Sequence, residues 1–359
     1  MIGLLKYYIK KRAYVVGIIT FIIIMLAVTM YRDGYIYSYE DYLGKEIFYP
    51  KNCPMGGYTF ISLVLVTIVP LFEFSFKMRK VSVDEFYKFP IRREKLYLVK
   101  FIIGLMEIFI PMTVFFLFTL LDITMSEHLF YISVYIIFYL LSIPVLFAIY
   151  SVITFIYAKC NTIHDGLINV TMIQCLFACI TYVIFEFMGV REICYLNSTS
   201  YISPIGCSNY SQYFFLYSPM TILANYGESF MEGNANINNP LSNSEIFTIV
   251  SLVFFFILGI VAFVLLIVNL KNDKSENSMD ISNSWFSYKV MIPTFISTLA
   301  IMSCSSGDSL ILLLIIAIFG YIGYAIYRRS FKIKLYDIVT MSSSLIGGII
   351  VGAILWNLM

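Results

Sequence analysis

Charged residues are scarce in this chain. Of its 359 residues only 13% are Asp, Glu, Lys or Arg, whereas 60% are hydrophobic and 18% are aromatic. Soluble domains carry about 25% charged residues. Together with a mean hydropathy of +0.85, this composition excludes a soluble globular fold.

Histidine is nearly absent, with only His128 and His164 in the whole chain. Neither lies in a metal-binding or catalytic pattern, and no general base for a serine enzyme can be identified. The cysteines show no ligand spacing with these histidines: Cys53, Cys160, Cys175, Cys179, Cys194, Cys207 and Cys304. We therefore expect no enzyme activity, no cofactor and no metal site. Cys194 and Cys207 share one loop, where they form either a disulfide or two free thiols.

A phosphate-binding loop of the pattern G-x-x-x-x-G-K-[ST] is also missing. Gly44-Lys45 is followed by Glu46 and does not complete it. That loop cradles nucleotide phosphates in many ATPases. If ATP drives this protein, hydrolysis has to take place in a separate subunit.

Long apolar runs dominate what is present. A helix needs about 20 apolar residues to cross a bilayer, because its backbone amides must be satisfied within the segment. Such runs recur at 13–30, 57–74, 101–121, 129–158, 167–188, 246–270, 290–304, 309–327 and 338–359. The sequence predicts an all-α, polytopic transmembrane bundle of about nine spans. The runs 290–304 and 309–327 are short, so they form either two full spans or a re-entrant hairpin, which makes the count eight to nine.

The distribution of Lys and Arg orients these spans, because short cytoplasmic loops retain basic residues. A cytoplasmic N-terminus places nearly all bases inside. Only Arg32, Lys45, Lys51 and Arg191 remain outside. The expected location is therefore the cell membrane as a multi-pass protein, with a bacterial plasma membrane as the specific expectation. Residues 1–12 mix apolar and basic side chains. This pattern indicates either a helix that lies at the membrane interface or a basic flank that only orients the first span.

Three acidic residues fall in or near the spans. Glu107 lies within the third run, where an ionisable side chain is costly and tends to face protein or water. It either lines a substrate path or is a neutral, hydrogen-bonded structural acid. Glu73 and Glu186 lie near the ends of their runs, where we expect them to be hydrated. In the last run, Ser344, Gly348 and Gly352 recur every four residues and predict a close helix contact, within the chain or between chains.

The most informative non-membrane segment joins the second and third runs. Ser82-Val83-Asp84-Glu85 fits a capping box, which predicts that a helix begins there. Pro90 disfavours helical geometry at the preceding residue, so the helix over 81–90 has about two turns. Val83, Phe86 and Tyr87 share one of its faces. So short a helix is marginal in water and needs a docking surface, either lipid or a cytoplasmic protein.

The order of this segment, KMRKVSVDEFYKFPIRREKLYLVKF, resembles the coupling-helix segment of type-2 ATP-binding-cassette (ABC) transporter permeases, in particular longer bacterial members. Two further features are similar: the inner loop 157–166, which contains Asn161, and the LYSPMTILANY stretch in the outer loop 189–245. The resemblance covers residues 1–270. Family members commonly have six spans, whereas this chain adds a linker at 271–289 and further spans at 290–359.

The resemblance implies the permease subunit of an ATP-driven exporter, with peptides or envelope-active compounds as its substrates. The implied partners are an ABC ATPase subunit, a second permease chain and the lipid bilayer, with no nucleic acid. The implied ATPase contacts are Ser82, Val83, Glu85, Phe86, Tyr87, Pro90, Arg92 and Arg93. A secondary transporter is the alternative. That class often shows internal repeats, which are not evident here, whereas an acid such as Glu107 fits it.

Overall fold

The computed structural model describes residues 2–31, 36–40, 46–50, 54–78, 92–125, 132–187, 223, 243–269, 288–305, 310–328, 330–332 and 334–358. Contacts divide the chain into two compact units. The first comprises Met1–Ala158 with Pro219–Glu276, and the second comprises Lys159–Ser218 with Asn277–Met359.

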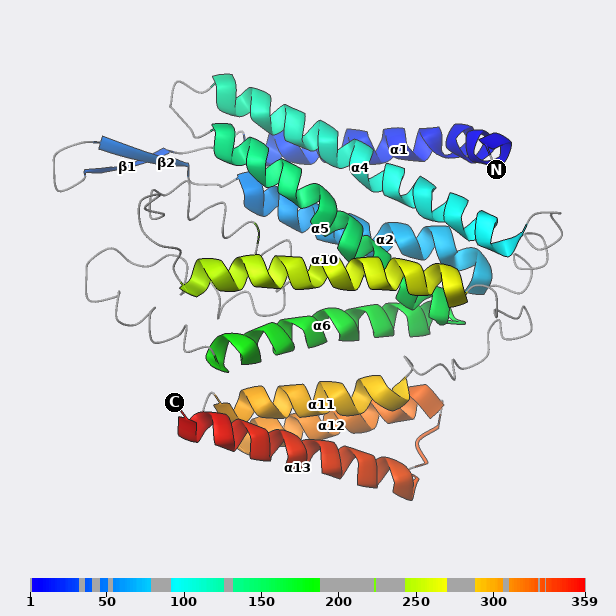
Figure 1. The fold of residues 1–359 in the computed structure, drawn as a ribbon, viewed down its shortest axis with the longest axis vertical. Helices are drawn as coiled ribbons and strands as arrows, with labels where there is room; N and C mark the ends of the chain where they lie inside the picture. Colours follow the sequence, from blue (N-terminus) through cyan, green and yellow to red (C-terminus); the bar gives the residue numbers. More distant parts are fainter. Residues whose placement is uncertain are drawn as a thin grey trace. The chain divides into compact units, whose positions relative to one another are not determined.

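Helices account for almost all of the described structure (Figure 1). In the first unit they are α1 (Ile2–Tyr31), α2 (Pro54–Phe74) with the short 3-10 turn η1 (Ser75–Met78), α4 (Arg93–Met125), α5 (Ile132–Lys159) and α10 (Asn243–Asn269). In the second unit they are α6 (Ile163–Phe187), α11 (Tyr288–Ser305), α12 (Leu310–Arg328) and α13 (Leu335–Leu358).

Each of these nine α-helices in the described chain contains most of one predicted apolar run. The predicted helical bundle of about nine helices is thus confirmed. Five helices are long and apolar enough to cross a membrane, and three others have shorter apolar stretches at Leu252–Val268, Tyr288–Ile301 and Leu312–Tyr327. The chain is therefore a membrane-embedded, multi-pass protein. α11 and α12 have 18 and 19 residues, within the range of about 17–25 for a span, which favours two crossings over a re-entrant hairpin.

The N-terminal residues form no separate interfacial helix. α1 runs without a break from Ile2 to Tyr31 over 30 residues, or about 45 Å at 1.5 Å per residue. The basic and apolar residues up to position 12 form the first three turns of α1. The interfacial-helix interpretation is therefore wrong, because the backbone continues helically into the apolar run.

A short β-hairpin departs from the all-α expectation. β1 (Ile36–Glu40) and β2 (Glu46–Pro50) pair antiparallel, with Ile36 opposite Pro50 and Glu40 opposite Glu46. Both strands are rich in Ile, Tyr and Phe, which favour extended backbone. The segment lies between α1 and α2, outside the apolar runs, so hydropathy alone did not reveal it.

Aromatic and hydroxyl side chains join α2, α4 and α5 in the first unit. The hydroxyls of Tyr58 and Ser142 lie 2.9 Å apart, and Tyr139 donates to the Thr113 hydroxyl at 3.0 Å. The Phe116 ring stacks on Tyr139 at a centroid distance of 4.0 Å. Hydrogen bonds between helices satisfy polar groups that have no water partner in a bilayer. This network holds the three helices in register.

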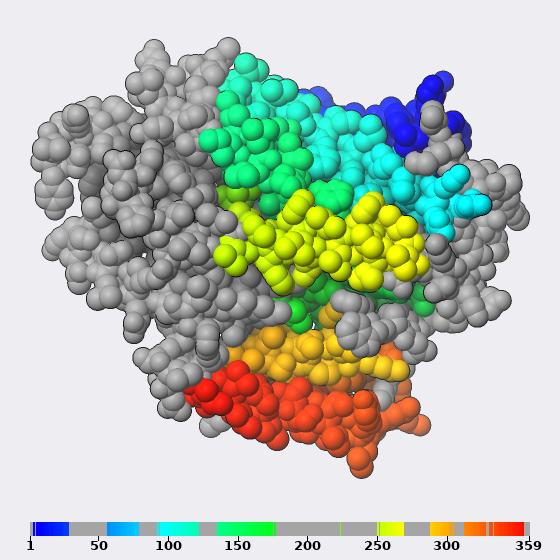
Figure 2. Space-filling model, viewed as in Figure 1, coloured from blue at the N-terminus to red at the C-terminus, as the bar shows by residue number. Residues whose placement is uncertain are grey.

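α10 packs on α4 and α5 on one side and exposes apolar residues on the other. A Cβ atom at Gly259 would lie only 2.4 Å from the Ala148 Cα, and the Phe263 ring lies 4.9 Å from that of Phe101. Figure 2 shows the atoms of α10, in yellow, as a continuous ridge on this face of the molecule. Val253, Ile257 and Val264 of this helix are each at least half exposed. Lipid tails are the natural neighbours of such a surface.

α11 is the centre of the second unit. Its residues Tyr288, Ile292 and Ile296 form a buried cluster with Ile316 and Tyr324 of α12. α13 packs closely on the same helix, and its glycines lie at the contact. A Cβ atom at Gly348 would lie 2.6 Å from the Ser297 carbonyl oxygen, and one at Gly352 would lie 2.6 Å from the Cys304 Cβ. The Ser344 hydroxyl donates to the Met341 carbonyl of its own helix at 2.9 Å.

α6 belongs to the unit that contains the C-terminal helices. Tyr288 at the start of α11 donates a 2.9 Å hydrogen bond to Asp165 at the start of α6. Only a three-residue turn separates the end of α5 from Ile163, where Thr162 caps α6 by accepting the Asp165 N–H at 3.2 Å. The boundaries of the compact units therefore differ from the division at residue 270 between the predicted six-span unit and the C-terminal spans. That division, as a functional boundary, stays a prediction.

Candidate functional site

Four charged side chains from three helices of the first unit meet inside the bundle. We call this group the ionic cluster: Arg12 of α1, Glu73 of α2, and Lys100 and Glu107 of α4. Arg12 Nη2 lies 2.6 Å from Glu73 Oε1, and Lys100 Nζ donates to Glu73 Oε2 at 2.8 Å. Arg12 Nε lies 3.8 Å from Glu107 Oε1. Glu73 is thus the shared partner of both bases.

Helix geometry explains why these residues converge. Lys100 and Glu107 are seven positions apart on α4, about two turns, so they point to one side of that helix. Glu73 is in the last turn of α2 and Arg12 in the third turn of α1. α4 contacts both of these helices, and all three meet at the end of the first unit where the chain begins (Figure 1).

The cluster is largely removed from solvent. Side-chain exposure is 0% for Glu73, 5% for Lys100 and 4% for Glu107, whereas Arg12 keeps 28% and forms its open side. A single charge in a span costs about 2.5–3.5 kcal/mol on insertion scales. Two acids and two bases balance one another here, so pairing offsets that cost. The expectation that Glu73 is hydrated is wrong, because the start of α4 and the side chain of Arg12 cover it.

Aromatic rings surround the ammonium group of Lys100. Its Nζ lies 4.6 Å from the centroid of the Tyr8 ring and 5.9 Å from that of Phe76. The Phe76 ring in turn packs on Tyr97 at 5.4 Å. A cation over an aromatic face is stabilised by about 0.5–2 kcal/mol. These contacts bring η1 and the first turns of α1 and α4 into one local structure.

Glu107 is the most weakly held member of the cluster. Its Oε1 is buried and accepts no hydrogen bond, and its nearest cation is the Arg12 guanidinium at 3.8 Å. Glu73 Oε1 also lacks a hydrogen bond of good geometry, but its 2.6 Å approach to Arg12 is a close ion pair. Removing the charge of Glu107 therefore disturbs fewer contacts than removing that of Glu73.

Lys77 connects η1 to the end of α5. Its Nζ donates a hydrogen bond to the carbonyl oxygen of Ala158, in the last turn of that helix. A cation is favourable there, because the last carbonyls of a helix are unsatisfied and carry partial negative charge. Lys77 and the ionic cluster together connect the end of α2 to α1, α4 and α5.

The predicted ATPase contacts lie between these anchored elements. Ser82, Val83, Glu85, Phe86, Tyr87 and Pro90 fall outside the described residues. Arg92 is exposed, and its carbonyl oxygen accepts the N–H groups of Lys95 and Leu96 at 3.0 and 3.3 Å, which caps α4. Arg93 is the first residue of α4. The segment 79–91 thus begins directly after η1 and ends nine positions before Lys100.

Sequence reasoning singled out Glu107 but not its partners. Arg12 and Lys100 were counted among the basic residues that orient the spans, and Glu73 was placed at a wet interface. The two acids of the second and third runs, Glu73 and Glu107, are matched in number by two nearby bases. This match is the sequence signal that could have revealed the cluster. In the described part of the chain, no group of three or more His, Cys, Asp or Glu side chains is arranged to hold a metal ion.

Comparison with known proteins identifies no relative. No protein-family model matches the chain, and no similarity to a curated protein or to a solved structure is found. The geometry and the sequence pattern therefore carry the functional interpretation.

Proposed function

We propose that this chain is the membrane-spanning permease subunit of an ATP-driven ABC exporter, with hydrolysis in a separate ATPase subunit. The contact for that ATPase is the segment 81–90 together with the two arginines that follow it. The contact residues are Ser82, Val83, Glu85, Phe86, Tyr87, Pro90, Arg92 and Arg93. A second permease chain completes the translocation path, and Glu107 lies along it. The proposed site of action is a bacterial plasma membrane, and the proposed substrates are peptides or envelope-active compounds.

One observation supports this proposal most directly: both ends of the segment 79–91 are fixed to the bundle. Before it, Lys77 bonds to α5 and Glu73 pairs with Arg12 and Lys100. After it, α4 begins at Arg93 and carries Lys100 into the same cluster. A displacement of the segment by an ATPase would therefore reach four helices at once. Networks of packed side chains, hydrogen bonds and salt bridges of this kind carry coupling between distant sites.

Co-purification tests the ATPase contact. The native chain, isolated from its own membranes, should bring down an ATPase. We expect binding to be lost when Phe86 and Tyr87 are both changed to Ala, which removes the aromatic face, and when Glu85→Lys reverses the charge at the helix start. Tyr336→Ala is the matched control, because Tyr336 is a 69% exposed aromatic residue outside this segment. Retained binding in both segment variants would refute the docking assignment.

The ionic cluster also favours a second candidate, a secondary transporter driven by an ion gradient. Buried ionisable residues in spans commonly lie on ion or proton pathways, and Glu107 has a buried oxygen without a hydrogen bond. Transport in vesicles separates the two functions. A permease with an ATPase partner needs ATP and continues when ion gradients are collapsed. Transport that persists without ATP and stops when the gradient is collapsed favours the secondary transporter.

A further inference from the structure

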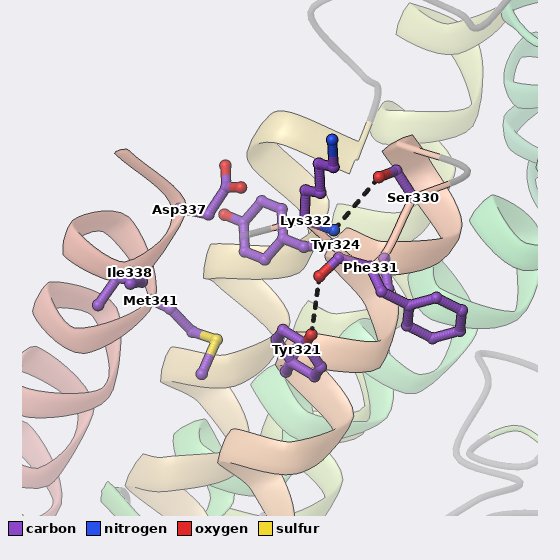
Figure 3. Close-up of a pocket in the computed structure, with 9 residues that line it drawn as sticks. Tyr321, Tyr324, Ser330, Phe331, Lys332, Asp337, Ile338 and Met341 are labelled. Atoms are coloured by element: carbon purple, nitrogen blue, oxygen red, sulfur yellow. Dashed lines mark hydrogen bonds between the residues drawn. The ribbon is translucent and has the colours of Figure 1, made fainter. Parts of the chain in front are cut away.

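A small pocket lies where α12 ends and α13 begins, within the second unit. It has a volume of about 160 Å³, and its polar lining comes from Tyr321, Tyr324, Ser330, Lys332 and Asp337 (Figure 3). Cavities of about 150 Å³ accommodate a group the size of benzene. The α12–α13 pocket is thus large enough for a small polar headgroup, but not for a peptide.

Hydrogen bonds hold the walls of this pocket in place. The Tyr321 hydroxyl donates to the Phe331 carbonyl oxygen at 3.1 Å, and the Lys332 N–H donates to the Ser330 hydroxyl at 3.2 Å. The Tyr324 and Thr340 hydroxyls lie 3.1 Å apart, which connects α12 to α13. These contacts connect residues 330–332, which line the pocket, to α12, and connect α12 to the first turns of α13.

Charge is arranged with the acid inside and the base at the rim. Asp337 is 5% exposed, and the Tyr324 hydroxyl points towards it in Figure 3. Lys332 is exposed at the mouth of the same pocket. A ligand that matches both groups carries a positive group that enters the pocket and a negative group that stays at its rim.

The surface around the mouth is typical of a membrane interface. Phe331 is 85% exposed, Leu335 79% and Tyr336 69%, and they alternate with the exposed bases Lys332 and Lys334. Aromatic and basic side chains are enriched at the level of lipid headgroups. Beyond the mouth, α13 continues with exposed apolar residues such as Ile338, Ile346 and Ile350, along which lipid tails can lie.

We propose that the α12–α13 pocket binds the headgroup of a phosphoethanolamine lipid. The primary ammonium group donates hydrogen bonds to the Asp337 carboxylate and to tyrosine hydroxyl oxygens. The phosphate binds Lys332 and Ser330, and the acyl chains extend along α13. The site is independent of the ATPase contact.

Other common headgroups match this arrangement less well. A phosphoglycerol headgroup has no cation, so it would place an anionic lipid beside the buried carboxylate of Asp337. A phosphocholine headgroup has a cation without N–H donors, so neither the carboxylate nor the tyrosine oxygens would receive a hydrogen bond. Free phosphoethanolamine shares the polar chemistry but lacks the chains that would lie on α13.

Native mass spectrometry of the delipidated full-length chain in detergent tests this proposal. Phosphatidylethanolamine, phosphatidylglycerol, phosphatidylcholine and free phosphoethanolamine are added separately at equal concentration. We expect phosphatidylethanolamine to bind preferentially, and Asp337→Asn to weaken its binding about tenfold or more, because the ammonium group then donates to a neutral amide oxygen instead of a carboxylate. Lys332→Ala should weaken it too, whereas the matched control Lys334→Ala, which removes an equal charge outside the pocket, should not.

Three results would overturn the proposal. Equal binding of phosphatidylglycerol and phosphatidylethanolamine would indicate a merely basic surface. An equal loss of phosphatidylethanolamine binding in Lys332→Ala and Lys334→Ala would also indicate a merely basic surface. Binding of free phosphoethanolamine as tight as that of the lipid would identify a soluble ligand instead. If Asp337→Asn does not fold, because Asp337 also lies in the first turn of α13, the comparison of the two lysine variants decides the outcome.

Discussion

At the scale of single residues, Glu73 is the key member of the ionic cluster, because two bases, the buried Lys100 and the partly exposed Arg12, pair with it. Arg12 and Lys100 lie 2.6 and 2.8 Å from its two oxygens. Loss of one member of a buried charge pair leaves the partner uncompensated in a low-dielectric environment, which costs about 3–5 kcal/mol.

We therefore predict that Glu73→Gln lowers the free energy of unfolding by about 3–5 kcal/mol. Glu107→Gln is the matched control. It should cost under about 1 kcal/mol, because its ion pair with Arg12 is long, at 3.8 Å, and Arg12 retains Glu73 as a partner. Unfolding in mixed detergent micelles measures both. An equal loss of unfolding free energy in Glu73→Gln and Glu107→Gln would contradict the assignment of Glu73 as the shared partner.

Some residues of the ionic cluster could be predicted from the sequence and others could not. Hydropathy locates Glu107 within a span, because an acid interrupts a long apolar run. It does not locate Arg12 or Lys100, because bases at the ends of runs satisfy the orientation rule equally well whether they face water or another helix. Which of the two they face depends on tertiary contacts with α2 and α4, which a single run of sequence does not contain.

At the scale of helices, the contact of α13 with α11 depends on two glycines. A Cβ atom at Gly348 would lie 2.6 Å from a carbonyl oxygen and 2.7 Å from the Ala300 Cβ, whereas one at Gly347 meets nothing within 4 Å. Neighbouring glycines on one helix thus differ only in whether they face the partner helix.

We predict opposite effects of Ala at these two positions. Gly348→Ala should destabilise the protein by about 1–3 kcal/mol, because the added carbon forces the helices apart. Gly347→Ala should be neutral or stabilise it by about 0.5–1 kcal/mol, because Ala favours a helix. Thermal unfolding of the two purified variants measures the difference. A loss of similar size in both would mean that the close contact is absent in the folded protein.

Helices were the elements most readily predicted from the sequence. Each apolar run became a helix, because the bilayer allows few alternatives for an unsatisfied backbone. The continuous α1 and the β-hairpin at 36–50 were not foreseen, since the polar ends of a helix and short strands outside the membrane leave no trace in hydropathy. The spacing of Ser344, Gly348 and Gly352 indicated a packed face, but only the structure identifies α11 as the partner of the two glycines.

At the scale of the whole molecule, the apolar runs and the distribution of Lys and Arg predict nine crossings from a cytoplasmic N-terminus, which places the turn at Asn161 on the cytoplasmic side as well. The tip between α11 and α12 then lies outside. In a cysteine-free background, a membrane-impermeant maleimide should label Gly307→Cys in intact cells. Asn161→Cys should react only after the cells are permeabilised. Labelling of Gly307→Cys only after permeabilisation would mean that the segment 290–327 does not cross the membrane.

The order of the helices along the chain adds a consequence of the ionic cluster for biosynthesis. α1 brings Arg12 and α2 brings Glu73, so the first helical pair delivered to the membrane is electrically balanced. α4 brings one base and one acid together, Lys100 and Glu107. Once α2 has joined α1, the part of the cluster already in the membrane is electrically balanced, and α4 adds equal and opposite charges to it.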